Sequence, residues 1–417
     1  MTGFHEQKTV IINSLKQIKR IYILLMEDLL HPVLTRMSSV KKPQAKALLL
    51  IIAAFAYFQG RANFRNMARF CPMAEDTLRR WSKRQFDYQE LNSQLLQKEV
   101  LKPEVERVAA LDASFIRKSG KATAEIGYFH SGSSGRVERG LEMSLLSVID
   151  LQRNTGFSLL ARQTKVSSEP GNRIDQALTQ IKSCQAQLEQ LKIKDIVVDA
   201  WYSKERFVSG VNNLGFMIVG KLREDARLHF KPKPHSGRGR PRKYGQRLKT
   251  TDLRCLKKTE MHGESFNLHS GVLYSKSLKR LIKIVLLRDK ESKKVKAILY
   301  STNQDEDAQD LLKKYRSRFQ IEFVIRDAKQ YTGLEHCQAR SSQAIENHFN
   351  NALTALNLLK IEDIKNSGTC DPKVVSIASW RRRKTNEHLA QIIFDKLGLS
   401  PKMSKIKETL EFIRGYG

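Results

Sequence analysis

Apolar residues change their spacing several times along the chain, and each change marks a different kind of secondary structure. From residue 10 to about 100, Leu, Ile and Ala recur at helical spacing. From about residue 107, short runs rich in Val, Ile and Leu replace them, as is typical of strands. The pattern predicts a mixed sheet with helices on it, an α/β fold. The expected strands are Val108–Ile116, Met143–Leu151, Phe157–Arg162, Asp195–Asp199 and Phe216–Lys221, with helices Asn172–Leu191 and Ser203–Val211.

The remaining chain changes first to strands and then back to helices. Between about 224 and 300 the helical period disappears, and we interpret this segment as a β-rich insertion. From Glu306 onward the period is helical again. The strand candidates are Ser265–Tyr274, Ile282–Leu287 and Lys296–Tyr300, and the expected helices are Glu306–Lys329, Gln343–Ile361 and Asn386–Ile413.

Within the first helical region, Asn63–Phe70 and Asp76–Arg84 resemble two short helices joined by a tight turn. This arrangement is typical of a helix-turn-helix, in which Arg79, Arg80 and Lys83 of the second helix would face DNA. A helical bundle with a solvated basic face would give the same pattern. Both interpretations stand at this point.

The charge balance indicates a polyanionic partner. The 417 residues include 74 Lys and Arg against 43 Asp and Glu, a formal net charge of +31. Such an excess favours nucleic acid. The most apolar stretch, Ala47–Phe58, is too short to span a bilayer and is expected to be a buried helix. Because Met1–Lys19 lacks the features of a signal peptide, we expect a cytoplasmic protein, associated with the nucleoid, with no membrane contact.

Cysteine spacing points away from disulfides and zinc. The five Cys residues are scattered, without a C-x-x-C pair or a histidine at zinc-finger spacing. We therefore expect them to be reduced and buried.

Two aspartates lie within or at the end of apolar strands. Asp112 is in the middle of the run Val108–Ile116, where a carboxylate is costly unless a cation or hydrogen bonds compensate it. Asp199 ends the run Ile-Val-Val-Asp, at the carboxyl end of a strand, where ligands collect in open α/β sheets. Either residue alone is more often a cap or a turn residue.

A third acid, Glu322, lies on a polar stripe of an otherwise apolar helix. At about 100° per residue, Tyr315, Arg318, Glu322 and Lys329 point in nearly the same direction. A helix that is apolar on most sides is buried, so its polar stripe should line a cleft. A solvated salt bridge between Arg318 and Glu322 is the alternative, which the apolar surroundings disfavour.

The spacing Y-x2-R-x3-E-x6-K, read here as Tyr315, Arg318, Glu322 and Lys329, resembles the signature of bacterial insertion-sequence transposases with a DDE active site. Leu-Asp112-Ala-Ser-Phe is similar to the strand of that family's first aspartate, and Val-Asp199-Ala-Trp-Tyr to its second. The resemblance covers about residues 105–360.

The resemblance implies an RNase H-like fold and a catalytic set of Asp112, Asp199 and Glu322 holding two Mg²⁺ or Mn²⁺ ions. It also implies cleavage at transposon ends, transfer of the 3′-hydroxyl into target DNA, and a hairpin-forming cut-and-paste route. Arg318 and Lys329 would hold phosphates, and Tyr315 would contact a phosphate or an unpaired base. Cutting paired ends implies double-stranded DNA as the partner and a homodimer in the DNA complex.

On this basis the chain divides into five segments. These are a helical DNA-binding domain over 1–105, the first part of the catalytic core over 106–223, the β-rich insertion over 224–300, the second part of the core over 301–365, and a helical segment over 366–417.

Two basic segments are further candidates for DNA contact. Arg227–Lys258 holds twelve Lys and Arg against one acid, and its centre resembles an AT-hook, with Arg238, Arg240 and Arg242. A basic loop without sequence preference would look the same. Ser131–Gly140 is expected to be a flexible loop with Arg136 and Arg139 available for phosphates.

Three other side chains near the acids have two interpretations each. Glu138 and Glu142 are extra metal ligands or, more simply, partners of nearby arginines. Trp201 either stacks on DNA or fills the core.

Two other functions remain open. A DNA-binding protein of the same descent would bind without cutting, and a structure-specific nuclease of the same fold would cut without joining.

Overall fold

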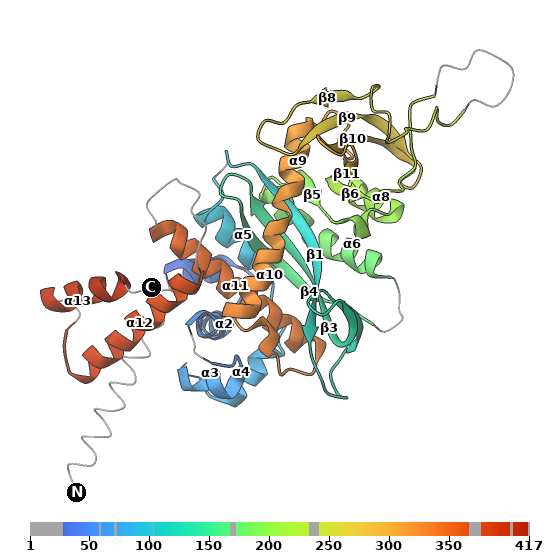
Figure 1. Ribbon diagram of the computed structural model, residues 1–417. Helices are drawn as coiled ribbons and strands as arrows, with labels where there is room; N and C mark the ends of the chain where they lie inside the picture. Colours follow the sequence, from blue (N-terminus) through green and yellow to red (C-terminus); the bar gives the residue numbers. More distant parts are fainter. Residues whose placement is uncertain are drawn as a thin grey trace, which may run out of the picture.

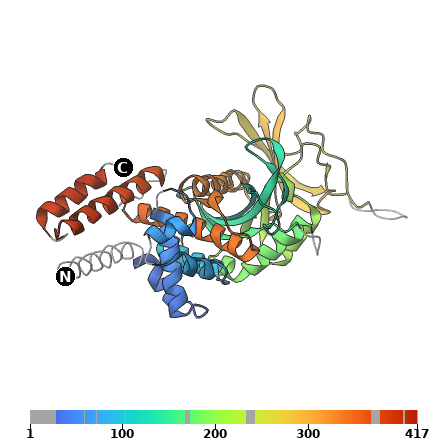
Figure 2. The same cartoon turned by 90° about the horizontal axis from the view of Figure 1, so that it is seen from below.

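The computed structural model describes residues 28–57, 60–70, 73–102, 104–166, 172–232, 242–366, 377–400 and 403–415. A mixed sheet runs through the middle of the molecule (Figure 1). The first and last helices lie at one end of this sheet, and the strands of the 224–300 segment lie at the other, in both views (Figures 1 and 2).

The described strands form an 11-stranded sheet. Its central order is β4-β3-β1-β5-β6, in which β1 and β4 pair antiparallel with β3, whereas β5 pairs parallel with β1 and β6. This is an RNase H-like arrangement, as the sequence predicted. The strands are β1 (Arg107–Arg117), β2 (Gly127–Ser131), β3 (Arg136–Asp150), β4 (Thr155–Gln163), β5 (Asp195–Val197), β6 (Met217–Leu222), β7 (Leu228–His229), β8 (Lys257–Thr259), β9 (Phe266–Ser275), β10 (Arg280–Asp289) and β11 (Val295–Ser301).

The 224–300 segment is rich in strands, and these strands extend the central sheet. β11 pairs antiparallel with β6, and β10, β9 and β7 follow outward in that order. The segment and the core are therefore joined by backbone hydrogen bonds as well as by the chain.

Helices cover the sheet and build both ends of the described chain. Within its described part, no helix is long and apolar enough to cross a membrane. Residues 28–36 are helical. The further helices are α2 (Lys42–Tyr57), α3 (Phe64–Phe70), α4 (Glu75–Ser82), α5 (Tyr88–Glu99), α6 (Arg173–Ser183), α7 (Gln185–Gln190), α8 (Glu205–Asn213), α9 (Ala308–Ser317), α10 (Phe319–Tyr331), α11 (Ser342–Asn366), α12 (Ile377–Lys396) and α13 (Ser404–Gly415), with 3₁₀ turns η1 (Ala200–Tyr202) and η2 (Leu334–His336).

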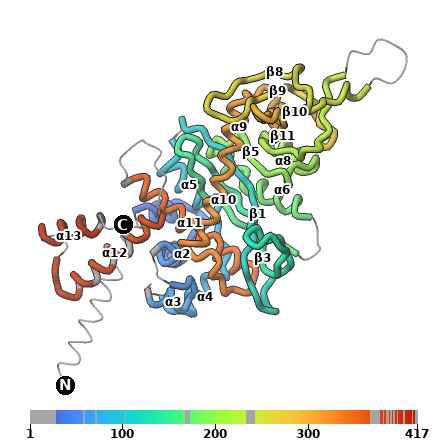
Figure 3. The backbone as a smooth tube through the Cα atoms, in the orientation of Figure 1, coloured from blue at the N-terminus to red at the C-terminus, as the bar shows by residue number. Residues whose placement is uncertain are grey.

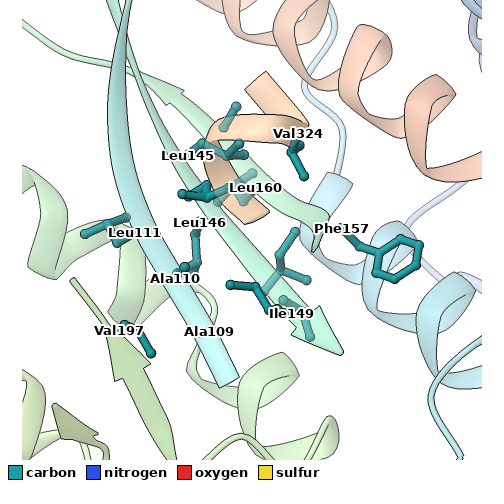
Figure 4. Packing of buried hydrophobic residues seen from close by; sticks show 14 of the residues in the cluster. Ala109, Ala110, Leu111, Leu145, Leu146, Ile149, Phe157, Leu160, Val197 and Val324 are labelled. Carbon is teal, nitrogen blue, oxygen red and sulfur yellow. The ribbon is translucent and has the colours of Figure 1, made fainter. Parts of the chain in front are cut away.

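The core is centred on β1, β3 and β4, which are buried along most of their length. Leu111, Leu145 and Phe157 from these strands are all buried, and Val324 of α10 packs among them (Figure 4). Strands buried on both faces read as continuous apolar runs, which is why β1 was recognisable from sequence. The backbone trace shows α9 and α10 crossing the sheet one after the other (Figure 3). α10 contacts β1 and β4, whereas α9 contacts β10, β11 and β6.

The outer edge of β4 is closed by side-chain amides of α11. Asn350 Oδ1 accepts from Ala161 N at 2.9 Å, and Asn350 Nδ2 donates to Ala161 O at 2.8 Å. Asn357 makes the same pair of bonds with Ser158 N and O, at 2.9 and 2.8 Å. An edge strand leaves backbone groups unpaired, and these two amides take the place of a further strand.

Three expected helices are interrupted. The helix expected over Asn172–Leu191 breaks at Cys184 into α6 and α7, and the one expected over Asn386–Ile413 is two helices, α12 and α13. The helix expected over Glu306–Lys329 breaks at Arg318, where Arg318 N donates to Tyr315 O and Ile321 N to Arg318 O, three residues apart. Such i to i+3 bonds mark a tightened turn that a periodicity analysis does not detect.

The loop expected over Ser131–Gly140 is partly wrong. β3 begins at Arg136 and pairs with β2 in a hairpin, with His130 opposite Val137 and Tyr128 opposite Arg139. Only 132–135 form the turn. Cross-strand pairing overrides the local preference of a Gly- and Ser-rich sequence for a loop.

A buried histidine predicts how stability depends on pH. His348 of α11 packs edge-on against Phe55 of α2, with ring centroids 5.1 Å apart, and its Nε2 lies 2.9 Å from Gly333 O. Burial lowers the pKa of His348 from 6.5 to about 4. In the unfolded chain this imidazole is therefore protonated below about pH 6.5, whereas in the folded protein it stays neutral down to about pH 4.

As the pH is lowered from about 6.5 to about 4, we expect the free energy of unfolding to fall by on the order of 3 kcal/mol through this residue alone. Urea unfolding of the wild type and of His348→Asn across this window measures it. The variant should lose this part of the pH dependence, and parallel curves for the two proteins would contradict the assignment.

Candidate active site

Asp112 and Asp199 come to the same edge of the sheet through the register of two parallel strands. The last parallel pair between β1 and β5 is Ala110 with Val197, and each aspartate lies two residues beyond its member of that pair. Both aspartates therefore lie at the carboxyl end of this parallel pair, Asp199 just after β5 ends, and both line one cavity. Asp112 is still within β1, where it pairs with Leu145 of β3.

Asp199 ends its strand by capping a short turn. Its Oδ1 accepts from Trp201 N at 3.0 Å and from Tyr202 N at 3.4 Å, so it is the N-cap of η1. Asp199 is therefore also a capping residue, which was the other interpretation of its position in the sequence. The cap uses one carboxylate oxygen and fixes the orientation of the other.

The third acid reaches this edge from α10. Arg318, at the junction of α9 and α10, donates from Nη1 to Asp112 Oδ2 at 3.1 Å and from Nη2 to Glu322 Oε1 at 2.7 Å. The guanidinium therefore joins the first aspartate to the glutamate. The expected i, i+4 pair of Arg318 and Glu322 is present: Arg318 is largely buried and also contacts Asp112, whereas the Glu322 side chain is 44% exposed, so the pair is partly solvated.

Burial is the main influence on the first aspartate, and it raises the pKa of Asp112 to about 6. The guanidinium of Arg318 and the backbone N–H of Ala113 oppose this effect, while the carboxylates of Asp199 and Glu322 add smaller raising effects. Arg318 therefore compensates the buried charge of Asp112 only in part. Such a cluster favours additional positive charge.

The other two residues of the polar stripe serve different contacts. Lys329 Nζ donates to Phe115 O of β1 at 2.8 Å and pairs with Glu335 at 3.0 Å, which fastens α10 to the strand of Asp112. Tyr315 is half-buried, and burial raises the pKa of its hydroxyl while the group hydrogen-bonds Arg318. The phosphate contacts expected of Lys329 and Tyr315 remain predictions.

A family model described as "Transposase DDE domain" matches residues 103–358, which is more than half of the chain. The chain belongs to this transposase family. It is thus a DNA-processing enzyme of transposition and DNA recombination, and the match covers the strands and helices that carry all three acids. No curated protein matches the sequence.

The acids of this transposase offer only oxygen ligands, the donor type that Mg²⁺ and Mn²⁺ prefer. Within the part of the chain that the structure describes, no three His, Cys, Asp or Glu side chains are grouped closely enough to hold a metal ion. At the acids, the guanidinium of Arg318 lies between Asp112 and Glu322. The donor chemistry and the incompletely compensated negative charge fit divalent cations, with Arg318 as the present counter-ion.

A cavity of about 330 Å³ opens beside Asp112 and Asp199, under α6. Glu142 lines it and pairs with Arg173 at 3.3 Å, while Glu138 pairs with Arg117 at 3.7 Å. Both glutamates pair with arginines, as expected, but the partners come from β1 and α6 and are not the arginines of the 131–140 segment.

The expected DNA-contacting arginines lie at three separate places. Arg136 and Arg139 are exposed on the β2–β3 hairpin. On α4, Arg79 pairs with Glu75, and Arg80 donates to Thr77 Oγ1 at 3.1 Å. Lys83 is the C-cap of α4, Arg242 is exposed beside the 224–300 strands, and Arg238 and Arg240 lie outside the described residues.

A buried lysine that the sequence did not single out ties α9 to β5. Lys314 Nζ lies 2.9 Å from Asp195 Oδ2 at the start of β5 and 2.8 Å from Glu306 Oε1 just before α9. All three side chains are largely buried. The only sequence signal was the position of Lys314 three residues after the buried Leu311, on the same helix face.

We expect Lys314→Met to lower the free energy of unfolding by about 3–5 kcal/mol, because it leaves two buried carboxylates without their cation. The adjacent Lys313 is a matched control, since it pairs with Glu106 on the surface, where the two side chains are 52% and 49% exposed. Lys313→Met should cost no more than about 1 kcal/mol. Urea unfolding of both variants measures the two changes. Equal losses of unfolding free energy would contradict a special role for the buried contacts of Lys314.

Proposed function

We propose that the protein cuts DNA at transposon ends and joins the released 3′-hydroxyl to target DNA, with Asp112, Asp199 and Glu322 as its catalytic residues. One arrangement carries the proposal. Arg318 bridges Asp112 and Glu322, and Asp199 lines the same cavity as Asp112, just after the next parallel strand. Three carboxylates that converge from two strands and a helix are suited to phosphoryl transfer.

In this proposal the three carboxylates hold two Mg²⁺ or Mn²⁺ ions. When bound, such ions supply activation of the attacking oxygen and stabilisation of the leaving oxygen. The attacking groups are water in the first step and a DNA 3′-hydroxyl in the second, so the protein needs no nucleophile of its own. A hairpin-forming route fits the same set of groups.

The protein's own cations would orient the DNA. Arg318 already donates to two acids, and its fork of donors suits a phosphate equally well. Tyr315 lies against Arg318 and would contact the same phosphate or a neighbouring base. Lys329 would keep α10 against β1 while contributing positive charge.

The outer parts of the chain would supply the remaining DNA contacts. We propose that α3 and α4 act as a helix-turn-helix, with Arg79, Arg80 and Lys83 toward DNA, and that the basic segment around Arg242 contacts the backbone or minor groove. The five-segment division given above would then separate recognition from chemistry. Two protomers, one at each end of the element, would form the active complex.

We expect Asp112→Asn, Asp199→Asn and Glu322→Gln each to reduce cleavage by at least about 10³-fold, because each removes several kcal/mol of transition-state stabilisation. Binding to the same DNA should persist. Cleavage and joining are measured with a plasmid that carries the terminal sequences flanking the gene, and binding is measured by gel shift.

Asp310→Asn is the matched control, since Asp310 is an exposed acid in the first turn of α9. Wild-type cleavage by any of the three variants would reject that residue as catalytic. A product that is cut but never joined would instead identify a nuclease of the same fold.

Removal of divalent metal should abolish cleavage, and Mg²⁺ or Mn²⁺ should restore it, because the acids cannot work without their counter-ions. DNA binding should survive chelation. A calorimetric titration with Mg²⁺ gives a readout that is independent of activity. Heat of binding should appear with the wild type and disappear with the double variant Asp112→Asn, Glu322→Gln, and undiminished heat would place the metal elsewhere.

A further inference from the structure

A groove of about 630 Å³ lies directly beside the second catalytic aspartate and has no role in the chemistry described above. It begins at η1 and the two residues before α8, passes the turn after β6, and ends at the residues that follow β9. We call it the Trp201 groove. The residues that matter here are Trp201, Lys204, Arg223, Arg227 and Lys276.

The Trp201 groove is positively charged. Four of those five residues are cations, and the lining includes one acid, Asp225, which already pairs with Arg223 at 3.0 Å. Lys276 N donates to Arg227 O at 3.1 Å, so the backbone holds two of the cations at adjacent positions on the wall. A groove of this charge attracts a phosphate backbone.

Trp201 is the residue that connects this groove to the acids. It lines both the groove and the smaller cavity that contains Asp112 and Asp199. Its backbone amide donates to Asp199 Oδ1, so its position relative to the acid is fixed. The indole is nevertheless 40% exposed, whereas the next residue, Tyr202, is only 5% exposed and packs inside.

A cation and an aromatic surface are therefore presented together. Lys204 Nζ lies 4.0 Å from the centre of the Trp201 ring. A nucleotide offers the matching pair of groups, a phosphate for the ammonium and a base for the indole. A base inside a duplex has its faces covered by its neighbours, so only an unpaired base can stack on the indole.

The same combination continues at the far end of the groove. Lys276 Nζ lies 5.9 Å from the centre of the Tyr244 ring, and Tyr244 stacks on Tyr274 with centroids 5.8 Å apart. Aromatic rings that alternate with cations are typical of surfaces that follow single strands.

We propose that the Trp201 groove binds an unpaired DNA strand next to the cut, with one base stacked on Trp201 and the phosphates along Lys204, Arg227 and Lys276. This inference rests on the proposed function, because it assumes that the scissile phosphate lies at the three acids. It assigns the groove a substrate class, single-stranded DNA, that neither the acids nor the family match specifies.

Binding of a fluorescein-labelled oligo(dT) of about 12 nucleotides tests the proposal, with a duplex of the same length for comparison. All measurements are made by anisotropy on the full chain in EDTA, so that loss of cleavage or of metal cannot affect them. Trp201→Ala should weaken oligo(dT) binding about 10-fold or more, since stacking contributes about 1–3 kcal/mol per base. Duplex binding should change less than about twofold, and Trp201→Phe should restore most of the loss.

Tyr128→Ala is the matched control, because Tyr128 is a 72% exposed aromatic residue on the β2–β3 hairpin, outside the groove. It should leave oligo(dT) binding unchanged. Thermal unfolding of each variant checks that the fold is intact.

The contribution of the cations is measured separately, through the salt dependence of oligo(dT) binding. Arg227→Ala and Lys276→Ala should each reduce the slope of log affinity against log salt for oligo(dT) by about 0.7, as expected for one lost phosphate contact. Lys182→Ala on α6 is the control, since Lys182 is exposed and outside the groove lining. Unchanged oligo(dT) binding by Trp201→Ala, or an equal loss on single and double strands, would overturn the proposal while leaving the catalytic assignment untouched.

Discussion

The guanidinium of Arg318 connects the strand and the helix that carry two of the three acids. Arg318 donates to Asp112 on a core strand and to Glu322 on a helix more than two hundred residues later in the chain. Without that cation, the buried carboxylate of Asp112 would lose its main compensating charge. In the proposed function, the negative charge that Arg318 leaves uncompensated is what would attract metal ions.

Two additional contacts attach the helices on either side of Arg318 to the sheet. Lys314, one helical turn earlier, locks α9 to the start of β5, and Lys329, three turns later, locks α10 to β1. The acids are carried by β1, by the chain after β5 and by α10, so each of these lysines fixes one pair of elements that must meet. The tightened turn at Arg318 lies between the two attachments. Positioning of the acids is thus shared between two lysines at opposite ends of the α9–α10 pair.

The sequence was sufficient for the parts of the fold that depend on long apolar runs. β1, β6 and the return to helix after residue 305 follow from periodicity, and the three acids follow from their position in apolar surroundings together with the family resemblance. The breaks at Cys184 and Arg318 were not predictable, because one tightened turn leaves the hydrophobic period almost unchanged. The Trp201 groove could not be predicted either. Its walls come from η1, from the end of β6 and the turn after it, and from the residues that follow β9, and their meeting depends on how the 224–300 strands pair with the sheet.

The pairing of the 224–300 strands with the central sheet also affects how the fold would respond to loss of that segment. Both lateral borders of the five central strands are closed, one by the side-chain amides of α11 along β4 and the other by β11 along β6. A shortened relative that lacked the 224–300 segment would expose β6 as a bare hydrogen-bonding margin, open to association with the same margin of a second molecule. In the protein as it stands, β11 occupies that margin, so the segment between the second and third acids leaves β6 no free backbone groups to offer another molecule on that side.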